Sequence, residues 1–432
     1  MITTAFVKMW GKTVGAVSYD TATNIAAFEY DRGFARTSVN PAPLKMPSAA
    51  GIIYQFPGLA NNATFKGLPG LLADVLPDKY GNALINSWLN KNGRPSDSLN
   101  PVEILCFIGK RGMGALEFEP VNPNTSAQAN NIEINALVEV AQKILQERTA
   151  MVADFNADEQ KALTDILTIG TSAGGARAKA IIAYNPATGQ AKSGQATAPA
   201  GFSHWLIKFD GVHDSQFGET SGYGRVEMAY HLMAVACGIE MTECRLLEEN
   251  GRAHFMTRRF DRPNEKDKLH VQTFCAMQHY DFNDVGMYSY EQLFETMRLL
   301  SLPYPQMEQL YRRMVFNVLA RNCDDHTKNF AFVMDKNVEW RLSPAYDICF
   351  AYRPGSPWVS SQSLTVNSKR TDITQADLLA VAKRVTIKTA VTIIEEVKTA
   401  VGNWAHYAAQ TNVDERLWKG IERELSIVNG EL

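Results

Sequence analysis

The sequence has no excess of basic residues and no long apolar run. Its 43 lysine and arginine residues are balanced by 46 aspartate and glutamate residues, which leaves a formal net charge of −3. A chain with this balance has no overall positive field to attract nucleic acid or an anionic membrane surface. No uninterrupted apolar stretch approaches the ~20 residues that span a bilayer, so we expect no membrane partner.

Paired cysteines are also missing. The six cysteines are scattered along the chain, and no two of them form a Cys-x-x-Cys pair. In a chain of this length they are expected to be reduced thiols, which favours a cytoplasmic location. Residues 1–8 lack the basic segment followed by an apolar segment that marks a secretory signal, which agrees with that location.

The sequence has 432 residues, a length that suggests two or three domains. Its pattern changes along the chain from β-rich to helical. Short apolar runs flank Gly11-Lys12, which predicts a β-hairpin within a β-rich region over residues 1–70. From Ser289 onward helical periodicity dominates, interrupted at 330–350, where the pattern predicts a second hairpin.

Other segments have clear compositional or periodic signals. Residues 119–131, rich in Pro and Asn, are expected to be a linker, and residues 185–203, rich in Gly, Pro, Ala and Thr, a long exposed loop. Apolar periodicity predicts single helices over 225–237, 304–322 and 387–409. Together these signals indicate an α+β protein with two lobes.

A polar stretch, Arg321–Phe330, lies between apolar elements. Within it, Asp324 and Asn329 are five positions apart, and the isolated carboxylate Asp347 follows the predicted hairpin. Protein kinases space their catalytic base and metal-binding Asn in this way and have a second metal-binding Asp downstream. A carboxylate can accept the proton of an attacking hydroxyl, while amide and carboxylate oxygens suit Mg²⁺. The pattern therefore predicts a phosphoryl-transfer centre.

Two other interpretations of this cluster remain open, a capped helix end and a transition-metal site. Asp325 and Lys328 are also what a capped helix end with solvated charges would contain. His326 beside two carboxylates could indicate a transition-metal site, although no second histidine cluster accompanies it. A lone histidine at a turn is more often a hydrogen-bonding group than a ligand, so we favour phosphoryl transfer.

A glycine-rich stretch and a strand lysine precede the cluster. Residues 170–179 contain three glycines and run into a strand near Lys179. Glycines let backbone N–H groups approach phosphate oxygens, but this stretch is neither GxGxxG nor a P-loop, so alone it is a weak signal. Lys208 lies inside an apolar strand, and Glu227 on the next predicted helix is its expected acidic partner. Kinases use such a lysine to bind phosphates.

The order of these features is more specific than any one of them. Glycine-rich loop, strand lysine, helix glutamate, Asp-x4-Asn, hairpin and second Asp follow one another as in protein kinases, although His-Arg-Asp and Asp-Phe-Gly are missing. We therefore predict an α+β, two-lobed protein-kinase-like fold.

Over nearly its whole length the sequence resembles the HipA family of bacterial serine/threonine-kinase toxins. The segments that carry the resemblance are 68–70, 76–82, 112–116, Gly174-Gly175-Ala176-Arg177-Ala178-Lys179, Asp324-Asp325-His326-Thr327-Lys328-Asn329-Phe330 and Leu342-Ser343-Pro344-Ala345-Tyr346-Asp347-Ile348. The family often has a Gln-Glu pair where this chain has Arg177 and Ala178, and some members have Gly where this chain has Asp325.

This resemblance implies three parts: a β-rich N-terminal subdomain (1–120), a mixed kinase-like N-lobe with the glycine-rich loop and hinge (132–262), and an all-helical C-lobe with the catalytic loop (263–432). It also implies ATP and Mg²⁺ as cofactors. Asp324 would be the catalytic base, Asn329 and Asp347 the metal ligands, and Lys208 the phosphate-binding lysine. Ser172 matches the family's autophosphorylated serine, whose modification would expel the nucleotide loop and switch the enzyme off. The residues implied at the nucleotide are Ser172, Ala173, Gly174, Gly175, Ala176, Lys179, Lys208, Thr257, Arg258, Phe260, His326, Lys328, Asn329 and Asp347.

The resemblance also implies partners. They are a HipB-like helix-turn-helix antitoxin and, through the antitoxin complex, the operator DNA that the pair co-represses. The implied protein substrate is an aminoacyl-tRNA synthetase, chiefly the glutamyl enzyme, whose phosphorylation would stall translation and cause growth arrest or persistence. Two alternatives stay open: a non-catalytic co-repressor module, and a small-molecule kinase that shares the Asp-x4-Asn pattern.

Overall fold

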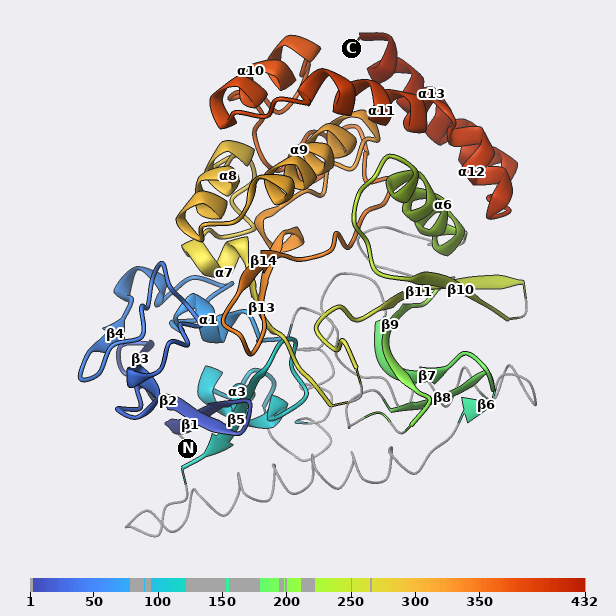
Figure 1. Cartoon of the computed structure of the whole chain (residues 1–432). Coiled ribbons are helices and arrows are strands. Elements are labelled where there is room, and N and C mark those ends of the chain that lie inside the picture. The colour runs from blue at the N-terminus through green and yellow to red at the C-terminus, as the bar shows by residue number, and fades with distance from the viewer. Residues whose placement is uncertain are drawn as a thin grey trace. The chain divides into compact units, whose positions relative to one another are not determined.

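The computed structural model of the protein describes residues 3–77, 89, 95–121, 153–154, 179–193, 198, 200–210, 222–249, 251–264 and 266–431 (Figure 1). The chain forms two compact units. The first comprises Met1–Gly218, Arg258–Gln272 and Val333–Glu339, and the second comprises Glu219–Thr257, Thr273–Phe332 and Trp340–Leu432. The chain therefore passes between the units several times.

The first unit begins with a five-stranded antiparallel sheet. Its strands are β1 (Thr4–Met9), β2 (Lys12–Asp20), β3 (Ile25–Tyr30), β4 (Ile53–Gln55) and β5 (Leu116–Pro120), in the order β4-β3-β2-β1-β5. The hairpin predicted at Gly11 is confirmed, because Met9 pairs with Lys12 and both Trp10 and Gly11 have positive φ. A two-residue turn of this kind matches the twist of its flanking strands.

Helix α3 (Pro101–Ile108) packs against β1, β2 and β5. A capping box fixes its start: the Glu103 N–H donates to Asn100 Oδ1, and the Asn100 N–H donates to Glu103 Oε2. Val102 and Leu105 are fully buried, so the helix extends the apolar core of this sheet.

Further strands of the first unit are β6 (Ala153–Asp154), β7 (Lys179–Asn185), β8 (Gln190–Ser193) and β9 (Ser203–Lys208), in the order β9-β7-β8-β6. The prediction of one long loop over 185–203 was wrong, since β8 pairs antiparallel with β7 and β6. Asn185 Oδ1 accepts from the Ala187 N–H and Gly189 has a φ of +67°, so a tight turn brings the chain back as a strand.

The second unit begins with the helix predicted at 225–237, which is α6 (Tyr223–Ala236). The hairpin of β10 (Cys244–Glu249) and β11 (Arg252–Arg258) follows it. Gly224 lies directly against β11, because a Cβ placed on it would be 1.9 Å from the Ala253 carbonyl oxygen. Only glycine permits this approach of helix to strand.

Helices dominate the rest of the second unit: α7 (Phe274–Gln278), α8 (Tyr290–Leu299), α9 (Tyr304–Leu319), α10 (Gln375–Val385), α11 (Ala390–Gly402), α12 (Trp404–Gln410) and α13 (Glu415–Glu431). Figure 1 shows α9 packed between its neighbours α8 and α11. The prediction of one helix over 387–409 was wrong. Helix α11 ends at Gly402 and α12 begins at Trp404, because the pair Gly402-Asn403 is a poor helix former. The predicted helix over 304–322 ends at Leu319, because Arg321 has a left-handed φ of 51°.

Short elements complete the described fold: η1 (Phe34–Arg36), η2 (Pro57–Leu59), α1 (Gly70–Ala73), η3 (Thr327–Asn329), β12 (His270–Thr273), β13 (Ala331–Met334) and β14 (Trp340–Leu342). The strands predicted within 330–350 are β13 and β14, and strand structure ends at Leu342. These elements confirm the predicted α+β class. The prediction that residues 263–432 are all helical was wrong, because β12, β13 and β14 form a three-stranded sheet within that range. Among the helices described, none combines the length and apolar character needed to cross a membrane.

The Gly224 contact leads to a test of the second unit's packing. We expect Gly224→Ala to destabilise the chain by about 1–3 kcal/mol, the typical cost of overpacking, because its Cβ would meet the Ala253 carbonyl oxygen. The matched control is Gly420→Ala in α13, where nothing lies within 4 Å of the added Cβ. That substitution should leave stability unchanged or raise it by up to ~1 kcal/mol. Thermal melts in which both variants behave alike would contradict the predicted contact.

Candidate functional site

The polar loop after α9 is held at its start by backbone hydrogen bonds. The Asn322 N–H donates to Asn317 O at 3.0 Å. The Cys323 N–H donates to Ala351 O, and the Ala351 N–H donates to Arg321 O, each at 3.1 Å. Since Ala351 lies shortly after Asp347 in the chain, the segment that carries the second predicted carboxylate is paired with the loop that carries the first.

Asp324 and Asn329 are joined by the loop itself. Asn329 Nδ2 donates to the backbone carbonyl oxygen of Asp324 at 2.6 Å. Asn329 is the last residue of the 3₁₀ turn η3 (Thr327–Asn329), and its N–H donates to His326 O at 2.9 Å. The five-residue spacing thus closes a compact turn. The Asp324 side chain keeps 44% of its surface exposed. Because the Asn329 amide is bonded through nitrogen, its oxygen is the end suited to a cation.

Asp347 belongs to a segment fastened to the same turn. The Tyr346 hydroxyl donates to Lys328 O at 2.6 Å, and the Ala345 N–H donates to Glu240 O at 2.8 Å. Asp347 itself is exposed and has a φ of 55°. Aspartate adopts this left-handed conformation more readily than most residues other than glycine.

The donors of this region suit a hard cation. Asn329 offers an amide oxygen and Asp347 a carboxylate, and Mg²⁺ takes oxygen ligands of these kinds. Within the described residues, no group of three or more His, Cys, Asp or Glu side chains could hold a metal ion. The oxygen donors fit Mg²⁺ better than the transition metals that prefer imidazole and thiolate.

Phe282 is a residue near the loop that the sequence analysis did not single out. The Lys328 ammonium lies 4.7 Å from its ring centroid, and the His326 ring packs edge-on against it with centroids 5.2 Å apart. His326 Nε2 is 3.9 Å from Asp324 Oδ1. The Phe282 ring therefore contacts both side chains, one of which, His326, also lies near the Asp324 carboxylate. No spacing in the sequence links residue 282 to the loop.

Asp325, the neighbour of Asp324, has the opposite environment. It is 1% exposed, and its carboxylate accepts from the Tyr290 hydroxyl and from the Ser363 N–H, each at 2.6 Å. Burial raises the pKa of the Asp325 carboxyl to about 7, although both hydrogen bonds act in the opposite direction. The side chain therefore supports the loop from within.

Two of the predicted phosphate-binding residues are cross-strand partners in the first unit. Lys179 on β7 pairs with Lys208 on β9, Lys179 being buried and Lys208 half-buried. The register therefore places the two lysines that are predicted to bind phosphate directly opposite each other. Glu227 is buried on α6 in the second unit, and its pairing with Lys208 stays a prediction.

The predicted hinge residues lie at and just after the end of β11. Thr257 and Arg258 are its last two residues, and Phe260 follows. The Thr257 and Thr242 hydroxyl oxygens are 3.2 Å apart, which ties the end of this strand to the start of the hairpin. The Arg259 N–H donates to His204 O at 2.9 Å, so the chain beyond β11 continues beside β9.

A buried ion network follows the hinge and was not foreseen from the sequence. Asp261 is fully buried and accepts from Arg259 Nε (2.9 Å), Arg259 Nη2 (2.7 Å), Arg262 Nη1 (2.6 Å) and the Gly114 N–H (2.8 Å). Arg262 also donates to Gly114 O and Gly112 O. Burial alone would raise the pKa of Asp261, but the two guanidinium groups outweigh it and hold the pKa well below the ordinary value. The network joins the hinge to the loop before β5.

The glycine-rich part of the prediction lies outside the described residues. Ser172, Ala173, Gly174, Gly175 and Ala176 all belong to the segment between β6 and β7 that is not described. Their roles at a nucleotide stay predictions.

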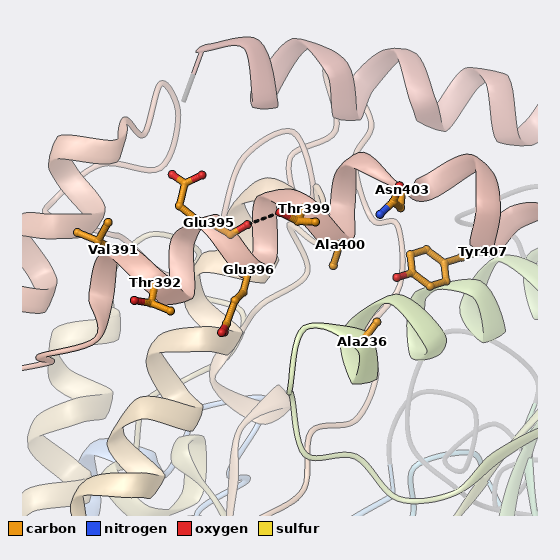
Figure 2. A pocket seen from close by; sticks show the side chains of 9 residues that line it. All are labelled: Ala236, Val391, Thr392, Glu395, Glu396, Thr399, Ala400, Asn403 and Tyr407. Carbon is orange, nitrogen blue, oxygen red and sulfur yellow. Dashed lines mark hydrogen bonds between the residues drawn. The ribbon is translucent and has the colours of Figure 1, made fainter.

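A separate groove of about 600 Å³ lies in the second unit between α6, α11 and α12 (Figure 2). Figure 2 shows Glu395 and Glu396 at this groove, and Arg312 Nη1 pairs with Glu396 at 2.5 Å. None of its lining residues is a predicted site residue. We therefore place the candidate site at the Asp324–Asn329 turn.

Asp325 gives a pH-dependent prediction. Its pKa is about 7 in the folded chain and about 3.9 in an unfolded one, so between these values the folded chain binds more protons. The stability that this carboxyl contributes therefore falls as pH rises through that window. We expect Asp325→Asn to gain melting temperature relative to the unsubstituted chain between about pH 5 and pH 8. A difference in melting temperature that is constant with pH would contradict the assignment.

Two family models match the chain. The HipA N-terminal domain matches residues 5–119, and the HipA-like C-terminal domain matches residues 171–404. Among curated proteins, Y4mE of Sinorhizobium fredii, named as a kinase, is 26% identical over 125 residues. That alignment covers 27% of this chain and only 30% of Y4mE.

One solved structure shows the same fold over nearly the whole chain. HipA of Shewanella oneidensis, from a toxin–antitoxin complex with HipB and operator DNA, matches with a TM-score of 0.67 and 14% identity, covering 99% of this chain and 96% of its own. At this identity the likeness shows the fold, which is the predicted α+β, kinase-like one. The proinflammatory kinase CtkA of Helicobacter pylori matches 53% of this chain and 88% of its own at 14% identity, with a TM-score of 0.35 too low to argue from. Because the C-terminal domain match alone spans more than half of the residues, the chain belongs to the HipA family.

Proposed function

We propose that this chain is an ATP-dependent protein serine/threonine kinase and the toxin of a toxin–antitoxin pair. The observation that carries the proposal is the turn closed by the Asn329–Asp324 hydrogen bond. This turn presents the partly exposed Asp324 carboxylate next to Asn329, and Tyr346 fastens the segment of Asp347 to it. Membership of the HipA family and the kinase name of Y4mE support the same reaction.

In the proposed reaction, a serine or threonine hydroxyl of the substrate attacks the γ-phosphorus of ATP. The bond from that phosphorus to the β–γ bridging oxygen breaks, and ADP leaves with the bonding electron pair. Asp324 accepts the hydroxyl proton as the new O–P bond forms. His326, 3.9 Å from Asp324 Oδ1, adds a hydrogen-bonding group near that carboxylate, and Lys328 contacts the same Phe282 ring as His326.

The remaining predicted residues bind the nucleotide. Asn329 and Asp347 would hold Mg²⁺, which when bound offsets the negative charge of the phosphates. Lys208, with Lys179 opposite it in the register, would bind phosphate oxygens. Backbone groups near Arg258 would bind adenine at the hinge.

We propose the partners from the family and from one solved complex. HipA of Shewanella oneidensis was solved with HipB and operator DNA, which supports a HipB-like antitoxin and co-repression of an operator for this chain. An aminoacyl-tRNA synthetase, chiefly the glutamyl enzyme, is the proposed substrate, and growth arrest or persistence the consequence. Autophosphorylation of Ser172 and a cytoplasmic location complete the proposal.

Asp324→Asn tests the proposed base. Loss of the proton acceptor should lower transfer of labelled γ-phosphate from ATP by at least about 100-fold, the usual contribution of a general base. The matched control is Asp372→Asn, an exposed carboxylate of the same unit, which should retain full activity. Both variants should melt as the unsubstituted chain does. A cell lysate incubated with labelled ATP and the unsubstituted chain should show a discrete labelled protein band.

Other outcomes would favour the rival functions. Near-normal transfer by Asp324→Asn would remove the assignment of the base. Label in a small molecule rather than in a protein band would indicate a small-molecule kinase. Tight antitoxin binding, with no thermal shift on adding ATP and Mg²⁺, would indicate a non-catalytic co-repressor.

A further inference from the structure

The two adjacent carboxylates of the loop are in opposite environments. The Asp324 side chain is 44% exposed, whereas Asp325 is 1% exposed. A buried carboxylate carries a large desolvation penalty unless hydrogen bonds or positive charges compensate it. Among the described residues Asp325 forms no salt bridge, so hydrogen-bond donors supply the compensation.

Each oxygen of Asp325 has its own donor, and the donors come from distant parts of the chain. Oδ2 accepts from the Tyr290 hydroxyl at the start of α8, and Oδ1 accepts from the Ser363 N–H. The Tyr290 hydroxyl is itself fixed, because it accepts from Asn317 Nδ2 of α9 at 2.9 Å. Tyr290 and Asn317 are also buried, so the donor cannot be replaced by solvent.

Ser363 holds the chain on both sides of Asp324. Its N–H donates to Asp325 Oδ1, and its hydroxyl donates to the carbonyl oxygen of Cys323 at 3.0 Å. The residue before Asp324 and the residue after it are therefore bound to one serine. With both neighbouring residues fixed, the direction in which the Asp324 side chain leaves the backbone is fixed as well.

We propose that Asp325, which accepts hydrogen bonds from Tyr290 and Ser363, is a positioning residue that orients the Asp324 carboxylate toward the substrate hydroxyl. It acts through Asp324 and touches no reacting atom. This inference rests on the proposed kinase function. A catalytic base misplaced by a fraction of an ångström loses rate without losing substrate affinity, which separates positioning from binding.

Tyr290→Phe tests the inference, because it removes one donor to Asp325 and keeps the ring. The matched control is Tyr311→Phe, another fully buried tyrosine of the same unit, whose hydroxyl donates to Leu378 O at 3.0 Å. The measurement is the rate at which the chain itself incorporates labelled phosphate from Mg–ATP, over a range of ATP concentrations, together with thermal melts. Here kcat is the maximal rate of this labelling, and KM is the ATP concentration at half of that rate. A third variant, Asp325→Asn, keeps an acceptor for the Ser363 N–H and should partly preserve the rate that Asp325→Ala loses.

We expect Tyr290→Phe to lower kcat by about tenfold with an unchanged KM for ATP, as misorientation does. Tyr311→Phe should lose a similar amount of melting temperature and keep its kcat. An unchanged kcat in Tyr290→Phe, or an equal loss in Tyr311→Phe, would overturn the positioning role while leaving the kinase function standing. An unsubstituted chain that incorporates no phosphate would overturn both.

Discussion

The hydrogen bond from the Asn329 side chain to the Asp324 carbonyl oxygen sets the geometry on which the candidate site depends. It turns a five-residue spacing in the sequence into a closed turn. The bond uses the amide nitrogen of Asn329 and the backbone of Asp324. The proposed function assigns the other groups of these two residues, the amide oxygen and the carboxylate, to the cation and to the substrate hydroxyl. Tyr346 then fastens the neighbour of Asp347 to the same turn through Lys328 O.

The surroundings of this turn are rigid for identifiable reasons. Asp325 is buried and bonded at both oxygens, and Ser363 binds the chain on either side of Asp324. In the first unit, Asp261 has a comparable role, since two arginines and the Gly114 N–H converge on it beside the hinge. In both places a buried carboxylate organises backbone that comes from distant parts of the sequence.

Local features could be predicted from the sequence, and contacts between distant residues could not. The hairpin at Gly11 depends on residues a few positions apart and is found in the structure as predicted. Asp324 and Asn329 were singled out by their five-residue spacing, and a hydrogen bond does join them, although their predicted roles stay predictions. By contrast, nothing in the sequence joins Tyr290 to Asp325 or Gly114 to Asp261, because these pairs meet only after the chain has folded. The break within 387–409 is a different case, because Gly402-Asn403 is a local signal. The apolar periodicity continues through these residues and outweighed that signal in the prediction, but the helix ends there.

The central claim is that this turn transfers the γ-phosphate of ATP, and the intact mass of the purified chain reports on it most directly. After incubation with ATP and Mg²⁺, the account predicts that the chain gains the mass of one phosphate, and that Ser172→Ala does not. A folded chain whose mass is unchanged by ATP and Mg²⁺ would contradict the account.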